Sequence, residues 1–332
     1  MVIDIHNHIF IQEAFNSIEN TYKDDIPVLK TDSDNKTYIK IGKDIRGPMA
    51  KAFFSVSDRL IEMKEEGVDK ETLSVFPYTF FYDLDVEEAL ALSKCQNDAI
   101  YQITRDYPEH FLGLATVPLQ DPQEAIEEME RAILKLKMVG VSIGSNVNGK
   151  NLDDLSLRPF FKRAQEPGAF IFVYYINVVG HERLQDYYMQ VIGGNPSETS
   201  VTIASMIYGG VFAELPNLKV CFALGGGFLP YQIGRLEKGF LVRPETRKFI
   251  KNPPSSYLKN IYFDTVLYET DSIEFMVKRI GAKNILFGTD SPVDMHDHDG
   301  VSRIKKMRIT LNEKKLILED NASRLLGINY VK

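Results

Sequence analysis

Short apolar runs of strand length alternate with longer amphipathic stretches along almost the whole chain. The first run covers residues 2–8, and later runs occupy 72–77, 111–117, 139–144, 169–175, 219–224, 261–266 and 284–289. Between most of them the apolar positions follow a helical period, near 85–106, 121–138, 156–166, 197–213, 229–242 and 271–280. Nearly continuous apolar strands separated by helices are typical of a parallel sheet that is covered on both faces.

Eight strand–helix units in one chain predict an α/β fold of the (β/α)8, TIM-barrel type, which commonly forms one domain of this size. A doubly wound open sheet is the main alternative, and it is disfavoured because no Gly-x-Gly-x-x-Gly follows the first strand. We therefore expect a single barrel domain over 1–332. A small β insertion is expected at about 18–46, where 37–41 alternates like an exposed strand, and additional C-terminal helices at about 300–332.

Two histidines, His6 and His8, stand at the end of the first strand. Residues two apart in a strand point to the same side, and barrel active sites use the carboxyl ends of the strands. Asp290 closes the eighth strand, which neighbours the first in a closed barrel. These three side chains form a ligand set suited to a divalent metal. The His-x-His pattern alone is a weak signal, because a polar pair in a loop has the same form.

The remaining histidines differ in their expected positions. His110 precedes the third strand and is expected on the surface, at the end of the barrel away from the chemistry. His181 follows the fifth strand, on the catalytic face, although a plain loop residue is the simpler interpretation. His296 and His298 follow the eighth strand in an acidic run, for which we favour a solvated loop over a site.

Composition narrows the class of protein. The 332 residues are 44% hydrophobic and 26% charged, and the net charge of −7 argues against a general nucleic-acid binder. Only two cysteines occur, so a disulfide framework is excluded and a reducing, cytoplasmic setting fits. We find no signal peptide and no apolar run of membrane-spanning length. The sequence thus predicts an intracellular protein that binds neither nucleic acid nor membrane.

Many short motifs resemble, in order, those of one enzyme family. They are Ile3-Asp4-Ile5-His6-Asn7-His8, Arg59-Leu60-Ile61-Glu62-Met63, Gly67-Val68-Asp69, Val117-Pro118-Leu119-Gln120-Asp121, Asn151-Leu152-Asp153-Asp154, Pro196-Ser197-Glu198-Thr199, Gly225-Gly226-Gly227, Pro253-Pro254-Ser255-Ser256-Tyr257, Asp290-Ser291-Pro292 and Asn321-Ala322-Ser323. Over almost its whole length the chain resembles the amidohydrolase-related (amidohydrolase 2) decarboxylases, most closely the α-amino-β-carboxymuconate-ε-semialdehyde decarboxylase branch of that family.

The resemblance implies non-oxidative decarboxylation of a small unsaturated or aromatic carboxylic acid. It also implies a zinc ion held by the His6–His8 pair, by a histidine ending strand five and by Asp290, with another histidine after strand six as the base. Two arginines of the family hold substrate carboxylates, and the matching positions are Arg46 and Arg235. A guanidinium suits a carboxylate because it offers two parallel charge-assisted hydrogen bonds. The resemblance places Arg235 near the active site of the neighbouring subunit of a homodimer.

Two family positions are altered in this chain. The strand-five histidine position falls on Tyr174, and the strand-six position falls on Leu224. Leu224 can neither bind a metal nor transfer a proton, and Tyr174 could bind only as a phenolate. The family ligand set and its general base are therefore both incomplete.

Three hypotheses follow. The first, which we adopt, is a carboxy-lyase with a rebuilt site: a divalent metal on His6, His8 and Asp290, with Tyr174, His181 or His296 replacing the base. On this hypothesis Tyr174, His181 and Asp290 are the predicted catalytic residues. The second is a metal-free isomerase, hydratase or cyclase that uses Tyr174 and the two histidines as acid and base. The third is a non-catalytic relative that binds a ligand.

Overall fold

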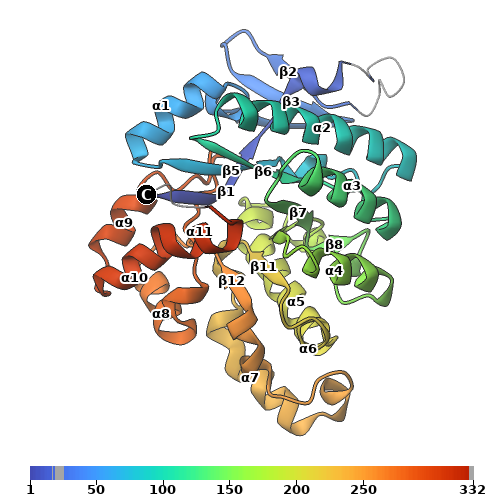
Figure 1. Ribbon diagram of the computed structural model, residues 1–332, viewed down its shortest axis with the longest axis vertical. Helices are drawn as coiled ribbons and strands as arrows, with labels where there is room; N and C mark the ends of the chain where they lie inside the picture. The colour runs from blue at the N-terminus through green and yellow to red at the C-terminus, as the bar shows by residue number, and fades with distance from the viewer. Residues whose placement is uncertain (17, 19–25, 329–332) are drawn as a thin grey trace.

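A curved parallel sheet surrounded by helices forms the body of the protein (Figure 1). This computed structural model describes residues 1–16, 18 and 26–328. Within that part of the chain the sheet has seven strands in the order β1-β5-β6-β7-β10-β11-β12. Their bounds are Ile3–Ile9, Lys70–Val75, Phe111–Ala115, Gly140–Gly144, Phe170–Tyr174, Lys219–Phe222 and Ile261–Phe263. Each matches a predicted run.

The predicted eighth strand, 284–289, closes the barrel without forming a regular strand. Ile285 makes a single parallel bridge to β12. On the other side, the N–H of Asp290 donates to the carbonyl of His6 in β1 at 2.8 Å. The φ angle of Asp290 is 62°, in the left-handed region, which ends extended pairing at that residue. The TIM-type barrel is confirmed, and the segment that closes it between β12 and β1 has irregular backbone.

Helices follow the strands in the predicted alternation. The predicted stretch 197–213 is divided in two at Gly209 and Gly210, where the second glycine has φ 79°. The helix bounds are Val56–Glu66 (α1), Val86–Asp106 (α2), Pro122–Leu134 (α3), Arg158–Gln165 (α4), Asn195–Tyr208 (α5), Val211–Glu214 (α6), Leu229–Val242 (α7), Thr270–Ile280 (α8), Gly300–Lys306 (α9), Leu311–Lys315 (α10) and Asn321–Leu326 (α11).

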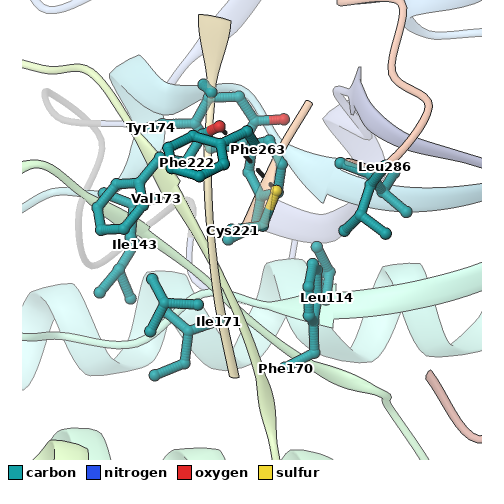
Figure 2. Close-up of a cluster of buried hydrophobic side chains, with 14 of the residues drawn as sticks. Leu114, Ile143, Phe170, Ile171, Val173, Tyr174, Cys221, Phe222, Phe263 and Leu286 are labelled. Atoms are coloured by element: carbon teal, nitrogen blue, oxygen red, sulfur yellow. Dashed lines mark hydrogen bonds between the residues drawn. The ribbon is translucent and has the colours of Figure 1, made fainter. Parts of the chain in front are cut away.

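The interior of the barrel is filled by large apolar side chains (Figure 2). Phe170 and Phe172 of β10 project to the same side as Tyr174 and are fully buried, and the ring centroid of Phe172 lies 5.1 Å from that of His6. A close approach of β7 and β10 depends on Gly140, because a Cβ at that position would lie 1.8 Å from the carbonyl oxygen of Phe170. The barrel core is therefore packed mainly by apolar side chains.

The predicted β insertion is a separate antiparallel sheet, at the top of Figure 1. It consists of β2 (Val28–Thr31), β3 (Thr37–Ile41) and β4 (Asp44–Met49). Residues 19–25 of the expected insertion, and 329–332 of the expected C-terminal extension, lie outside the described residues. Among the described helices, none combines the length and the apolar character that crossing a bilayer demands.

Candidate metal centre and active site

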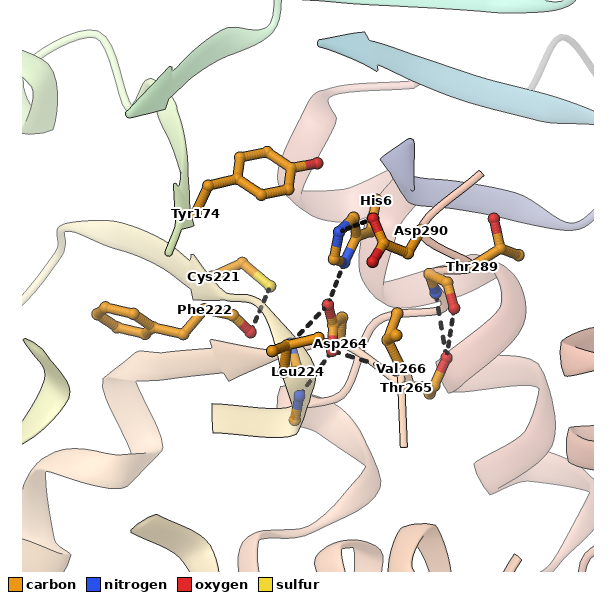
Figure 3. A network of polar contacts seen from close by, with 12 residues as sticks. His6, Tyr174, Cys221, Phe222, Leu224, Asp264, Thr265, Val266, Thr289 and Asp290 are labelled. Carbon is orange, nitrogen blue, oxygen red and sulfur yellow. Dashed lines mark hydrogen bonds and ion pairs between the residues drawn. The ribbon is translucent and has the colours of Figure 1, made fainter. Parts of the chain in front are cut away.

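His6, His8 and Asp290 meet at the carboxyl end of the barrel, and we call them the central cluster. The Nε2 atoms of His6 and His8 lie 3.0 and 3.1 Å from the same oxygen, Oδ1 of Asp290. All three side chains are almost fully buried. Strand β1 directs both imidazoles to one side, and the irregular closing segment places the carboxylate opposite them, as Figure 3 shows for His6 and Asp290.

The far nitrogen of each imidazole is held by a second group. Nδ1 of His6 lies 2.5 Å from Oδ2 of Asp264, and Nδ1 of His8 lies 3.2 Å from the carbonyl oxygen of Val75. A carbonyl only accepts, so Nδ1 of His8 carries the proton, and the carboxylate favours the same tautomer for neutral His6. Both Nε2 lone pairs are then directed at one point. Partners of this kind orient the histidines of metal sites.

Asp264, just after β12, is fixed by backbone donors. It accepts hydrogen bonds from the N–H groups of Leu224 at 3.1 Å and Gly225 at 2.7 Å, and from Val266 at 3.2 Å (Figure 3). The sequence analysis did not identify this residue. A carboxylate at the carboxyl end of a predicted strand was the signal that could have found it.

Electrostatics favour positive charge in the central cluster. Burial alone would lower the pKa of His6, but Asp290 and Asp264 outweigh it and raise this pKa to about 10. Burial lowers the pKa of His8 more than Asp290 raises it. Burial would raise the pKa of Asp290, yet the two histidines hold it well below its ordinary value. Two carboxylates therefore surround His6, and they attract either a proton or a metal cation.

The backbone of β1 is fixed by other buried polar groups. The hydroxyl of Thr289 donates to Asp4 at 2.6 Å, which ties the closing segment to β1. Arg59 of α1 donates to the carbonyl of His8 and to Glu71 of β5, the latter at 2.8 Å. These contacts give a structural role to Asp4 and Arg59, which belong to the motifs found in the sequence.

The two altered family positions lie beside the central cluster. Tyr174 ends β10, and its ring centroid lies 5.0 Å from that of His6 and 4.6 Å from that of His8. Its hydroxyl lies 3.3 Å from Oγ of Ser74, and burial raises its pKa well above the ordinary value. The side chain is therefore a neutral phenol that packs on both imidazoles. Leu224 is nearly buried and contributes only its backbone N–H to the network.

Tyr175 was not identified from the sequence, although it contacts the central cluster. Its hydroxyl donates to Oδ2 of Asp290 at 3.3 Å. Burial, followed by the charge of Asp290, raises its pKa well above the ordinary value, so it too is a neutral donor. The carboxylate thus faces the histidines with one oxygen and a tyrosine with the other.

The central cluster fits a divalent cation. Nε2 of His6 is buried and has no hydrogen-bond partner, despite its short distance to Asp290. One ligand atom from each of the three side chains can be chosen so that all lie within 4.8 Å of one another. Two imidazoles and one carboxylate are common ligands of zinc, iron and manganese sites. The expected ligand set is brought together by the fold.

Comparison with known proteins identifies the family: a model of the amidohydrolase family matches residues 3–328. The chain belongs to this family. It is 39% identical over 276 residues to 2-amino-3-carboxymuconate-6-semialdehyde decarboxylase from Dictyostelium discoideum, which spans 82% of this chain and 76% of the relative. The resemblance found in the sequence motifs is confirmed.

Solved structures of two named decarboxylases share the fold. The 5-carboxyvanillate decarboxylase from Sphingomonas paucimobilis superposes with a TM-score of 0.85, at 24% identity and 99% coverage of both chains. A dihydroxybenzoic acid decarboxylase from Polaromonas, solved with manganese and the inhibitor 2-nitroresorcinol, gives 0.81 at 22% identity, covering 99% of this chain and 97% of that one. Both of these proteins are named decarboxylases, and the second was solved with bound manganese.

The two predicted substrate arginines of this amidohydrolase-family chain lie on different elements. Arg46 belongs to β4 of the insertion, and its guanidinium carbon lies 4.4 Å from the ring centroid of Tyr78. It pairs with Asp44 at 3.4 Å, while its Nε is buried and has no hydrogen-bond partner. Arg235 is an exposed residue of α7, with no ion pair to any described residue.

His181 is not brought to the central cluster. Its side chain is 68% exposed, and the ion pair it makes, at 3.6 Å, is with the adjacent Glu182. His110 is exposed, as expected.

The expectation of a solvated loop is wrong for His296. Its side chain is only 2% exposed and lies between Glu62 and Glu66 of α1, with Nδ1 3.2 Å and Nε2 3.0 Å from their carboxylate oxygens. His298 reaches Glu66 at 2.7 Å and is 69% exposed. The acidic run was expected to face solvent because polar loops are common, and its partners on α1 lie far away in the sequence. We call Glu62, Glu66, His296 and His298 the peripheral cluster.

Proposed function

We propose that this chain is a metal-dependent decarboxylase, which removes CO2 non-oxidatively from a small unsaturated or aromatic carboxylic acid. The observation that carries the proposal is the convergence of two oriented Nε2 atoms on one carboxylate oxygen of Asp290. His6, His8 and Asp290 would hold the cation, which we propose to be zinc. A bound divalent cation supplies Lewis-acid polarisation of a substrate oxygen.

The residues of the chain then have distinct roles. Asp264 and the Val75 carbonyl orient the imidazoles, and Asp290 completes the ligand set. Because Tyr174 and Tyr175 remain neutral, either hydroxyl can donate a hydrogen bond or a proton to substrate, and neither acts as a base at neutral pH. We favour Tyr175 for contact with the reacting group, since its hydroxyl already reaches Asp290. Tyr174 fills the space beside the imidazoles.

Substrate carboxylates are proposed to bind Arg46 and, from a second copy of the chain, Arg235. The buried, unpartnered Nε of Arg46 leaves a donor for a carboxylate. Arg235 lies on the exposed side of α7, which extends from the barrel at the bottom of Figure 1, and its guanidinium has no ion-pair partner among the described residues. A homodimer in which this arginine enters the neighbouring site would give it a partner.

Access to the central cluster requires movement at the barrel mouth, because its ligands are almost fully buried. The hydroxyl of Tyr188 donates to Asp294 at 2.7 Å and so joins the segment after β10 to the segment after Asp290. We infer that this contact opens when substrate enters. We also propose a cytoplasmic location, because a chain with two cysteines has no disulfide framework of the kind found in secreted proteins.

Activity and metal content together test the function. The purified protein is assayed for CO2 release from 2-amino-3-carboxymuconate semialdehyde and from dihydroxybenzoates, before and after chelation and zinc addition. We expect turnover that chelation abolishes and zinc restores. His6→Ala should lose both metal and turnover, whereas the exposed control His110→Ala should keep both. Turnover that resists chelation, or that changes the acid without releasing CO2, would instead favour a metal-free isomerase, hydratase or cyclase.

The remaining assignments have their own tests. His181→Ala decides whether that exposed imidazole takes part in turnover. Absence of both turnover and carboxylic-acid binding would favour a non-catalytic relative. For the dimer, inactive His6→Ala and inactive Arg235→Ala proteins are mixed and allowed to exchange subunits. Recovery of activity is expected, because each mixed dimer then contains one intact site. No recovery, despite proven exchange, would contradict a shared site.

A further inference from the structure

The peripheral cluster lies where the end of α1 meets the segment that follows Asp290. Glu62 and Glu66 are one turn apart on α1, and Glu66 is its last residue. Two like charges at this spacing repel each other, and both lie near the negative end of the helix dipole. Concentrated negative charge of this kind requires a cation nearby.

No described lysine or arginine forms an ion pair with Glu62 or Glu66; their partners are His296 and His298. Arg59, on the same helix, is committed to Glu71 at 2.8 Å. The neighbouring acidic residue Asp297 is already neutralised by Arg303 at 2.6 Å. The two glutamates are therefore available to the two imidazoles and to whatever binds between them.

A second observation points to a ligand. Nδ1 of the buried His296 has no hydrogen bond, although it lies 3.2 Å from Oε1 of Glu62, because the alignment is poor. An unsatisfied ring nitrogen that faces carboxylate oxygens is costly unless another group binds it. Nδ1 of His298 lies 2.7 Å from Oε1 of Glu66 and 4.0 Å from Oε1 of Glu62.

These distances suit a metal ion. Ligand atoms about 2.0–2.1 Å from a tetrahedral zinc are roughly 3.3 Å from one another. The separations of 2.7, 3.2 and 4.0 Å between donor atoms in the cluster bracket that value, and one donor atom from each residue lies within 4.8 Å of the others. Small side-chain adjustments would bring all four donors to one ion. The partial exposure of His298 leaves a path for its entry.

We propose that Glu62, Glu66, His296 and His298 form a second metal site, which takes a divalent transition cation of the zinc class. The bound ion would link the carboxyl end of α1 to the chain that continues from Asp290. Its role would be structural, since the four donors leave no open position for substrate on a tetrahedral ion. The site is independent of the proposed activity, because no residue is shared with the central cluster.

The alternative occupant is a proton. Burial lowers the pKa of His296, but the two glutamates raise it to about 9, so an imidazolium could neutralise the cluster without a metal. A proton on His296 accounts for the position of that imidazole. It does not account for the position of the exposed His298, whose Nδ1 lies 2.7 Å from Glu66. The experiment must therefore distinguish metal uptake from protonation.

Metal stoichiometry decides between the two occupants. The full-length protein is stripped with a chelator and titrated with Zn²⁺ against a competing chromophoric chelator, with bound metal measured by mass spectrometry after gel filtration. Two equivalents per chain are expected for the wild type. The double variant Glu66→Gln/His298→Ala should bind one equivalent and lose the Zn²⁺-dependent rise in melting temperature that the second equivalent provides.

A matched double variant controls for charge and histidine content. Glu65→Gln/His110→Ala removes the same groups from exposed positions outside the cluster, and it should still bind two equivalents. His6→Ala should lose the central equivalent and keep the peripheral one. The proposal is overturned if Glu66→Gln/His298→Ala binds as much Zn²⁺ as the control, or if His6→Ala binds none. Cobalt absorption in the His6→Ala background reports the tetrahedral geometry directly.

Discussion

The central and peripheral clusters both contain histidines and carboxylates, and one segment of chain contributes to each, yet their donors are held differently. In the central cluster each imidazole has its far nitrogen fixed by a separate group, Asp264 or the Val75 carbonyl. In the peripheral cluster the two glutamates are the only ion-pair partners of the His296 imidazole among the described residues, so the same groups both orient and neutralise it. A cation therefore enters the central cluster without breaking the contacts that orient its ligands.

Burial separates the clusters further. His6, His8 and Asp290 lie inside the barrel mouth, whereas His298 is 69% exposed at the surface. Charge interactions are stronger where water is excluded, so the central cluster should bind its cation more tightly. The two clusters therefore differ in whether separate groups orient the histidines, and in the exposure of one donor, His298.

The largest expected effect is the loss of a central ligand. His6→Ala should lower the affinity for the more tightly bound Zn²⁺ ion by more than about 100-fold. This exceeds the ~10–100-fold loss typical of groups that only orient a ligand. Turnover should be lost with it. The measurement is chelator-competition affinity together with CO2 release. If His298→Ala weakened the tighter equivalent more than His6→Ala, the assignment of the two clusters would be reversed.

A smaller effect is expected from the group that orients His6. Asp264→Asn keeps the shape but loses the charge, so the tighter equivalent should weaken about 10–100-fold. The exposed Asp34→Asn in the β insertion is the control and should change nothing. An unchanged Zn²⁺ affinity in Asp264→Asn would show that the contact between Asp264 and His6 does not contribute to metal binding in the central cluster.

The two tyrosines should differ in their effect on turnover. Tyr175→Phe removes a hydrogen bond to the carboxylate of Asp290, worth about 1.5 kcal/mol, and should lower kcat about tenfold. Tyr174→Phe should cost about 1 kcal/mol of stability at most, because Ser74 still donates to the carbonyl of Asn7 at 2.6 Å. Steady-state kinetics and urea unfolding provide the values. A larger loss of kcat in Tyr174→Phe than in Tyr175→Phe would support Tyr174 as the catalytic tyrosine.

The smallest expected effect tests whether water is excluded from the part of β11 that lies beside the central cluster. Cys221 lies in β11, and burial followed by the charge of Asp264 raises its pKa well above the ordinary value. Its thiol should stay protonated and unreactive toward a disulfide reagent at pH 9 in the native protein, and react after unfolding. Because only the unfolded state releases this proton, the thiol contributes stability that declines as pH rises above about 8.5. Rapid native labelling would contradict a water-excluded wall.

Sequence patterns predicted most of the fold because strand and helix periods are local properties. The strand run at 170–174 and the helix α7 were predicted nearly to the residue. The irregular backbone at Asp290 was not, since its left-handed φ depends on how the closing segment fits against His6.

The site was predictable only in part, for a related reason. His6, His8 and Asp290 could be grouped once a closed barrel was assumed. Asp264 and Tyr175 act through contacts between distant segments, and neither belongs to a spacing pattern. His296 was misread as solvated because its partners lie on α1, at the other end of the chain.

The position of Arg46 has a consequence for how substrate preference could change. This arginine stands on the antiparallel sheet β2-β3-β4, which shares no strand with the barrel that carries His6, His8 and Asp290. Changes in length or register of that small sheet would shift the guanidinium relative to the central cluster without disturbing a single ligand. If Arg46 binds substrate as proposed, substitutions in the small sheet can alter substrate recognition while the residues of the central cluster stay unchanged.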